Sequence, residues 1–401
     1  MTFLKNLAVS LFSFFLFLSL TVFGIAFTLN STVLNPDFIT AELNRLDITS
    51  LVKEFIKIEN PPPEIPNLNE IINKTVADIE PQFKVETDSA IRSVYDYLLG
   101  RTPEPRLALT LRQTYLSTDF VTAAVSSIDV APLLAPTVSQ QLTQAIPIQV
   151  PNVETYVTQA LTAAEPSLKQ QLIAASGPVF DYLLGISPSL KAPISLQEAL
   201  ASLKDILRQA FIDSPPEVEI AGIPLTAIPP DQRGAAFDAF YPTFASAIPT
   251  TYTIDTSIIQ PELRASITDG ITSAEEGLTQ ARQYVAMFQQ YYTLLLVFMA
   301  VMALGIILIV RNVKDITHIL GIPLFTYGAL EYAGILVTKY LISSGRMQFS
   351  EIPPQLETWL LQLINNSMKP LETFSIALLI VGLVLTAISF LYKPRKDINW
   401  S

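Results

Sequence analysis

EPQFKVETDSAIRSVYDYLLGRTP, residues 80–103, decides how this chain is built, because it returns as EPSLKQQLIAASGPVFDYLLGISP at residues 165–188. The two stretches lie 85 residues apart, and 11 of their 24 positions are identical without a gap. Self-similarity at a fixed spacing indicates one supersecondary unit that is used more than once. The repeat therefore predicts an architecture of similar helical units, and it carries no chemistry of its own.

The similarity extends upstream at a slightly different spacing, since DFITA at residues 37–41 recurs as DFVTA 82 residues later. Each unit is predicted as a helix, a proline-rich loop and two further helices. Pro81 and Pro166 should start a new helix or kink one, because proline removes a backbone hydrogen bond. Gly100 and Gly185 should end the last helix, because glycine accepts the left-handed conformation there.

After each glycine, the pattern of apolar residues becomes typical of a β-strand. Alternating leucines predict a short strand over residues 107–111, and residues 192–196 occupy the corresponding place before a helix from Gln197 to about Phe211. A third, degenerate unit lacks the proline, so its helix is predicted to run from about Glu262 to Val310. Such a helix would be about 70 Å long. It exceeds the roughly 30 Å of membrane hydrocarbon, and the excess should stand outside as a stalk.

Composition places the chain in a membrane. Half of its residues are hydrophobic and its mean hydropathy is +0.40, which is too apolar for an ordinary soluble protein. A cleavable signal peptide is the alternative for the first apolar segment. Residues 354–368 predict an amphipathic helix, either at the outer interface with Trp359 as an anchor or packed against the stalk. The predicted spans are residues 6–29, 292–310, 316–343 and 371–392.

Basic residues set the predicted orientation. If every apolar segment crosses the membrane, six basic residues fall on one side. The positive-inside rule assigns that side to the cytoplasm. The chain is then predicted to cross the plasma membrane with both termini in the cytoplasm. Residues 30–290 and 344–370 lie outside the cell. The six residues are Lys5, Arg311, Lys314, Lys393, Arg395 and Lys396.

The predicted fold class is a mainly α membrane protein. Four transmembrane helices carry a large extracytoplasmic domain that is mostly helical, with minor β structure, and is built from two clear repeats and one degenerate repeat of about 85 residues. The predicted segments are an anchor at residues 1–29, repeat 1 at 30–113, repeat 2 at 114–198, a degenerate repeat 3 with an insert and the stalk helix at 199–290, and a three-helix transmembrane region at 291–401 with an amphipathic outer loop at 344–370.

Charge and composition exclude several classes of function. Residues 29–289 hold 30 acidic and 16 basic residues, a net charge of −14, so this region would repel nucleic-acid phosphates. The chain has no cysteine and a single histidine, His318, which we expect to cap its helix or reach the interface. A thiolate nucleophile and a multi-histidine metal site are therefore excluded within one chain. With no phosphate-binding loop or nucleophile elbow, we predict no catalytic, cofactor or metal residues and no enzyme.

Three acidic residues are candidates for function. Glu331 is the only carboxylate well inside a predicted span, where an ionisable group is costly and marks a functional site by default. The alternatives are a protonated, hydrogen-bonded packing residue, a proton or ion relay, and a group in a wet cleft. Asp96 and Asp181 recur at equivalent positions between two aromatic residues. They are either equivalent ligand-binding acids or helix-end carboxylates paired with a local donor.

The preferred interpretation is a membrane protein whose outer domain binds or tethers an extracytoplasmic protein or ligand. The order of span, large outer domain, two spans, small outer loop and span resembles permease subunits that transmit force to a cytoplasmic ATPase. That resemblance implies a membrane protein partner, but the predicted cytoplasmic turn leaves little room for a coupling helix. An extracytoplasmic hydrolase is the third alternative. The lipid bilayer is the one partner expected under every interpretation.

Overall fold

The structure is a computed structural model in which most of the chain can be described. The described residues are 2–55, 68–132, 135, 153–195, 197–213, 219–220, 223–245, 250–257, 259, 261–344, 352 and 354–392. They form two compact units. The first unit comprises Met1–Asp47, Ile91–Pro105 and Gly277–Ser401, and the second comprises Ile48–Ala90 and Arg106–Glu276.

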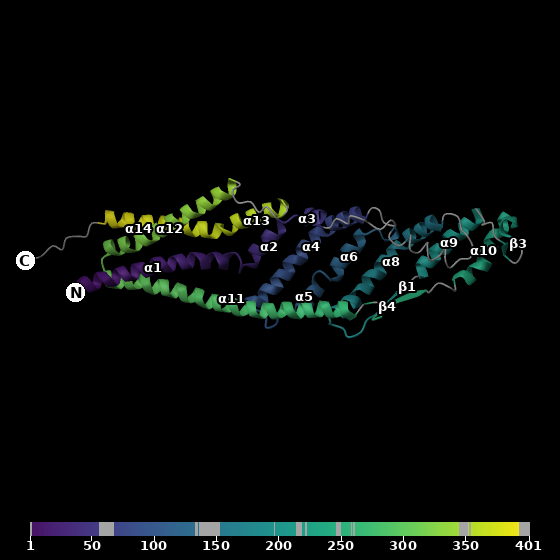
Figure 1. Ribbon diagram of the computed structural model, residues 1–401, viewed down its shortest axis with the longest axis horizontal. Coiled ribbons are helices and arrows are strands. Elements are labelled where there is room, and N and C mark those ends of the chain that lie inside the picture. Colours follow the sequence, from purple (N-terminus) through teal and green to yellow (C-terminus); the bar gives the residue numbers. More distant parts are fainter. Residues whose placement is uncertain are drawn as a thin grey trace, which may run out of the picture. The chain divides into compact units, whose positions relative to one another are not determined.

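The described residues are mainly helical (Figure 1). Two small antiparallel sheets pair β1 with β4 and β2 with β3. The elements are α1 (Thr2–Ser31), α2 (Pro36–Asn44), α3 (Ile48–Phe55), α4 (Leu68–Leu98), α5 (Leu107–Gln113), α6 (Thr118–Ser127), α8 (Val153–Leu183), β1 (Lys191–Ser195), α9 (Gln197–Asp213), β2 (Glu219–Ile220), β3 (Ile223–Pro224), a 3₁₀ turn (Leu225–Ala227), α10 (Pro230–Ala245), β4 (Thr251–Asp255), α11 (Pro261–Val310), α12 (Val313–Ser343), α13 (Pro354–Ser367) and α14 (Lys369–Leu391).

Four helical segments are long and apolar enough to cross a membrane: Phe3–Ser31, Pro261–Val310, Val313–Ser343 and Pro354–Leu391. The prediction of a mainly α, multi-pass membrane protein is confirmed at this level. In the first unit, α1, α11 and α12 enclose an apolar core. Its fully or largely buried side chains include Leu16, Leu20, Met302, Ile306 and Tyr327.

The long helix predicted to enter the membrane is confirmed. Helix α11 is 50 residues long and continues without interruption between Gln280 and Tyr292. Gly270 and Gly277 lower helix propensity. A Cβ added at either position would meet nothing within 4 Å, so neither glycine is required by packing. The turn from α11 to α12 is short, with Arg311 in the left-handed region at φ 58° and Asn312 as the N-cap of α12.

Of the two outcomes predicted for the prolines, a new helix is wrong. Pro81 lies inside α4 and Pro166 lies inside α8, and each helix is 31 residues long. The reason is clear in the second unit, where Leu161 and Leu168 lie on either side of Pro166 and are buried in the same core cluster. Burial of this continuous apolar stripe outweighs the hydrogen bond that proline removes.

The strand predicted over residues 107–111 is also wrong, because these residues form helix α5. The backbone N–H of Leu107, at the start of that helix, donates to the Glu275 carboxylate at 2.7 Å. This cap comes from a residue far away in sequence, so alternation of apolar residues could not reveal it. The other predicted strand is confirmed as β1, whose Ala192 and Ile194 are buried, and the helix after it is confirmed as α9.

Helices α4 and α8 share local details beyond their length. Gly100 and Gly185 have φ values of 76° and 73°, and their N–H groups donate to the Tyr97 and Tyr182 carbonyls at 3.0 and 3.1 Å. These are the helix ends that the glycines predict. Glu80, directly before the proline of α4, accepts from the hydroxyl and the N–H of Thr49 near the start of α3. Its counterpart accepts the Val130 N–H at 3.1 Å.

The carboxylates of Glu80 and Glu165 are held ionised. Burial opposes ionisation, but the Lys84 ammonium and the Thr49 donors lower the pKa of Glu80, and the Lys169 ammonium and the Val130 N–H lower the pKa of Glu165. A carboxylate that binds its proton more weakly in the folded state stabilises the fold above its unfolded pKa. That stabilisation is lost as the pH falls through the lowered folded value.

We therefore expect Glu165→Gln to lower the free energy of unfolding at neutral pH by about 1–3 kcal/mol, since the side chain is only 15% exposed and its donors lose a charged acceptor. The loss should shrink at acidic pH, as the pH falls through the lowered pKa of Glu165 and the wild-type carboxylate also becomes protonated. Thermal unfolding of the detergent-solubilised protein across acidic pH measures both effects. Glu276→Gln, at an exposed position, is the control. An equal loss in both variants would contradict the prediction.

Candidate functional site

The two recurring aspartates each pair with an arginine. In the first unit the Asp96 carboxylate pairs with Arg101 at 2.9 Å. In the second unit the Asp181 carboxylate accepts from Arg112 Nε at 2.6 Å, and Arg112 also donates to the Leu116 carbonyl. Asp96 thus pairs with a donor five residues away, whereas the partner of Asp181 lies 69 positions away in sequence. The two arginines are not equivalent in the repeat, so the recurring acids have acquired different partners.

The tyrosines that follow these aspartates mark a second kind of contact. In the first unit the Arg282 guanidinium lies 4.7 Å from the centre of the Tyr97 ring and donates to the Pro103 carbonyl at 3.0 Å. In the second unit the Arg264 guanidinium lies 4.4 Å from the centre of the Tyr182 ring and donates to the Tyr182 carbonyl at 3.0 Å. Such cation–π pairs each contribute roughly 0.5–2 kcal/mol.

Sequence reasoning missed these arginines, although a signal existed. Arg264 and Arg282 are the only basic residues between positions 261 and 310. Each binds the end of a helix whose C-terminal glycine is left-handed. Each arginine therefore stabilises its own unit, where its guanidinium donates to backbone carbonyls at the end of a helix.

Glu331 lies on α12, partly exposed and one helical turn after Tyr327. The Tyr327 side chain is buried against α1, since a Cβ added at Gly24 would collide with its hydroxyl oxygen. No hydrogen bond or ion pair joins the Glu331 carboxylate to another described residue. Glu331 therefore stays a candidate without a defined chemical role.

A second carboxylate near the spans was not predicted. The Glu372 carboxylate accepts from the Lys339 ammonium at 2.5 Å, and this pair joins α14 to α12 with both side chains mostly buried. A buried pair is costly to break on one side only, because the remaining charge loses its partner. The pair therefore links α12 to α14.

Helix α13 docks on α2 within the first unit. The Trp359 indole donates to the Glu42 carbonyl at 2.8 Å, and the Asn366 amide donates to both oxygens of the Glu42 carboxylate at 3.0 and 3.1 Å. Glu42 is only 3% exposed and also pairs with Arg45. A buried carboxylate with this many donors is a structural anchor.

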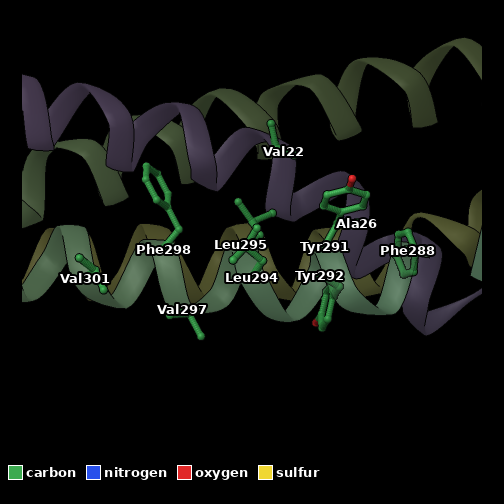
Figure 2. A pocket seen from close by; sticks show the side chains of 10 residues that line it. All are labelled: Val22, Ala26, Phe288, Tyr291, Tyr292, Leu294, Leu295, Val297, Phe298 and Val301. Atoms are coloured by element: carbon green, nitrogen blue, oxygen red, sulfur yellow. The ribbon is translucent and has the colours of Figure 1, made fainter. Parts of the chain in front are cut away.

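Two grooves open beside α1. The first, about 640 Å³, runs between α1 and α11 and is almost entirely apolar (Figure 2). Its side chains come from Val22 and Ala26 of α1 and from residues 288–301 of α11, including Phe288 and Phe298. Its apolar lining matches the chemistry of the lipid chains that surround a membrane helix.

The second groove, about 520 Å³, lies between α1 and α12 and is lined by both polar and apolar side chains. It includes His318, whose Nδ1 lies 3.4 Å from the Ser389 hydroxyl. Sequence reasoning missed this polar groove, because its members are spread over two helices far apart in the chain. The polar lining residues are Asn6, Ser10, Ser13, His318 and Thr326.

Within the part of the chain that the structure describes, no group of three or more histidine or acidic side chains is placed to hold a metal ion. The geometry thus contains ion pairs, aromatic–arginine contacts and membrane grooves. No protein-family model, curated protein or solved structure matches this chain.

Proposed function

We propose that this protein is a membrane-anchored tether. Residues 30–290 form a repeated, mainly helical domain outside the plasma membrane that binds an extracytoplasmic protein or ligand. The observation that carries this proposal is the continuity of helix α11. This helix bears Arg264 and Arg282, which contact the ends of α8 and α4, and it continues without a break into a segment that is apolar enough to span a membrane. The helix that holds the outer domain is thereby also its anchor.

The repeated construction is supported by equivalent local geometry. The helices α4 and α8 have the same length, the same internal proline and the same left-handed glycine end. The glutamates before the two prolines bind backbone N–H groups at the start of the preceding short helical segment. A duplicated unit would produce such recurrence in both its hydrogen bonds and its amino-acid sequence.

The cytoplasmic side favours a tether over a subunit driven by an ATPase. Only Arg311 and Asn312 separate α11 from α12. A coupling subunit needs a cytoplasmic element that grips its partner, and two residues cannot form one. In the permease-like alternative, the N- or C-terminal residues would therefore have to bind the ATPase. Parts of both termini lie outside the described residues.

The orientation predicts a labelling pattern that the cysteine-free chain makes easy to read. A cysteine in place of exposed Ser189 should react with a membrane-impermeant thiol reagent on intact cells, because it lies in the outer domain. A cysteine in place of exposed Asn312 should react only after permeabilisation, because it lies in the cytoplasmic turn. Labelling of position 312 on intact cells would overturn the orientation.

Partner binding is tested with a photo-reactive amino acid at Ile186 of the full-length protein in native membranes. Ile186 is 49% exposed and lies next to Ser187, whose carbonyl accepts from Arg264 at 3.3 Å. Burial of an exposed apolar side chain by a partner is favourable, so this position reports on binding. We expect a discrete cross-linked species there and none from Ser266, an exposed polar control on α11. A specific cross-link to an ATPase from position 312 would instead support the permease-like alternative.

A further inference from the structure

The polar groove between α1 and α12 contains serine and threonine hydroxyl groups that have no hydrogen-bond partner among the described residues. Serine and threonine hydroxyls in a membrane helix usually donate to a carbonyl of their own helix, as Thr28, Thr317 and Ser375 do here. Across residues 3–30, 292–310, 313–343 and 369–391, only three such hydroxyls have no partner among the described residues. They are Ser10, Ser13 and Thr326, and all three line this groove.

The rest of the lining is polar in the same way. Asn6 has no hydrogen-bond partner among the described residues, and His318 uses one ring nitrogen on Ser389. Asn6, Ser10 and Ser13 follow the i, i+4, i+7 spacing that places residues on one face of a helix. Lipid chains cannot bond any of these groups, and an unsatisfied polar group in hydrocarbon is costly. The groove therefore calls for a polar occupant.

Depth decides what kind of occupant fits. Ser13 lies seven residues beyond Asn6, roughly 10 Å further along the helix, and Thr326 lies eight residues beyond His318, roughly 12 Å. A lipid headgroup stays at the interface and reaches only the first of these groups. A helix that runs alongside α1 can present polar atoms at every depth.

We propose that this groove binds a second copy of the chain, forming a parallel dimer through the α1–α12 face. A two-fold axis along the membrane normal places each residue at the same depth as its counterpart, so the face must be self-complementary. Amide, hydroxyl and imidazole groups each donate and accept, and no lining residue is an acid or a lysine. Phe14, 60% exposed at the groove, provides a bulky side chain that can enter the partner's groove.

The first test uses disulfide formation in native membranes. Since the chain has no cysteine, Ser10→Cys gives a single thiol in the groove, and Leu11→Cys gives one at the same depth on lipid-exposed surface outside it. Under a mild oxidant, we expect Ser10→Cys to form covalent dimer at least about tenfold more efficiently than Leu11→Cys. Equal yields would overturn the proposal, because they would reflect random encounters.

The second test removes the polar face. Two differently tagged copies are co-purified from membranes, with the triple variant Asn6→Leu, Ser10→Leu and Ser13→Leu against a control of Leu7→Val, Leu11→Val and Leu18→Val on exposed positions of the same helix. We expect co-purification to fall about fivefold or more in the first variant only. Undiminished co-purification would overturn the proposal, as would a photo-reactive residue at position 10 that captures only lipid. These results do not depend on the outer domain binding a partner.

Discussion

Replacing Gly382 with leucine is expected to separate α14 from α12 and to prevent the membrane helices from assembling. A Cβ added at Gly382 would collide with the Phe325 backbone nitrogen and lie 2.7 Å from its Cα. Backbone atoms cannot move aside as a flexible side chain can, so the two helices must part. We expect a loss of at least about 3 kcal/mol, at the upper end of the cost of overpacking.

The effect should be this large because small residues recur along the seam between these helices. Gly321 and Gly328 on α12 also approach the backbone of α14, and a Cβ on Gly328 would lie 2.6 Å from the Leu379 nitrogen. On α14, buried Ser375, Gly382 and Ser389 recur every seven residues. Small residues at this spacing let membrane helices pack at close backbone distance.

Gly334→Leu is the matched control, because Gly334 lies on α12 and an added Cβ there meets nothing within 4 Å. The yield of monodisperse protein and its thermal unfolding in detergent measure both variants. We expect Gly334→Leu to remain folded and to gain helix propensity. If Gly382→Leu is as stable as Gly334→Leu, the close seam between α12 and α14 is not present in the membrane.

Inserting two glycine–proline pairs after Ala281 is expected to break the rigid connection along α11. Residues 277–310 form one uninterrupted helix within the first unit. Spin labels on cysteines at exposed Gln280 and Val301 should lie roughly 32 Å apart along the axis, with a narrow distribution of distances. The insertion lies between the labels and should broaden that distribution strongly, because proline and glycine both end the helix.

The same insertion separates a tether from a force-transmitting subunit. A tether needs only a connection, so cross-linking of a partner from position 186 should survive the insertion. A coupled subunit needs a stiff rod and should lose the response of its cytoplasmic side. A broad distance distribution in the uninterrupted protein would show that the stalk is not rigid, and the coupling alternative would then be excluded.

Much of the membrane architecture is local and therefore readable from the chain. Membrane spans depend on about 20 consecutive apolar residues, and α1, α11, α12 and α14 all meet this condition. Helix ends at Gly100 and Gly185 depend on the conformational freedom of one residue, and both have positive φ. Helix α11 was predictable because no proline or other stop signal interrupts residues 262–310.

The failures have a common physical cause in long-range contacts. No new helix begins at Pro81 or Pro166, because apolar packing on both sides of Pro166 keeps α8 continuous. Residues 107–111 were read as a strand, but Glu275, 168 positions away, caps them as a helix. The secondary-structure propensity of a residue contributes less free energy than one such buried or charged contact. Tertiary contacts therefore override it.

The sequence by itself determined that this chain is a helical membrane protein with a recurring motif, because span length, helix period and glycine ends are properties of neighbouring residues. Only the tertiary structure decided which side chains meet. It brought Arg264 and Arg282 onto the tyrosines of distant helix ends, gave Asp96 and Asp181 different arginines, and collected unpaired hydroxyls from two helices in one groove. Such meetings depend on how helices pack, and spacing along the chain does not encode that in any local pattern.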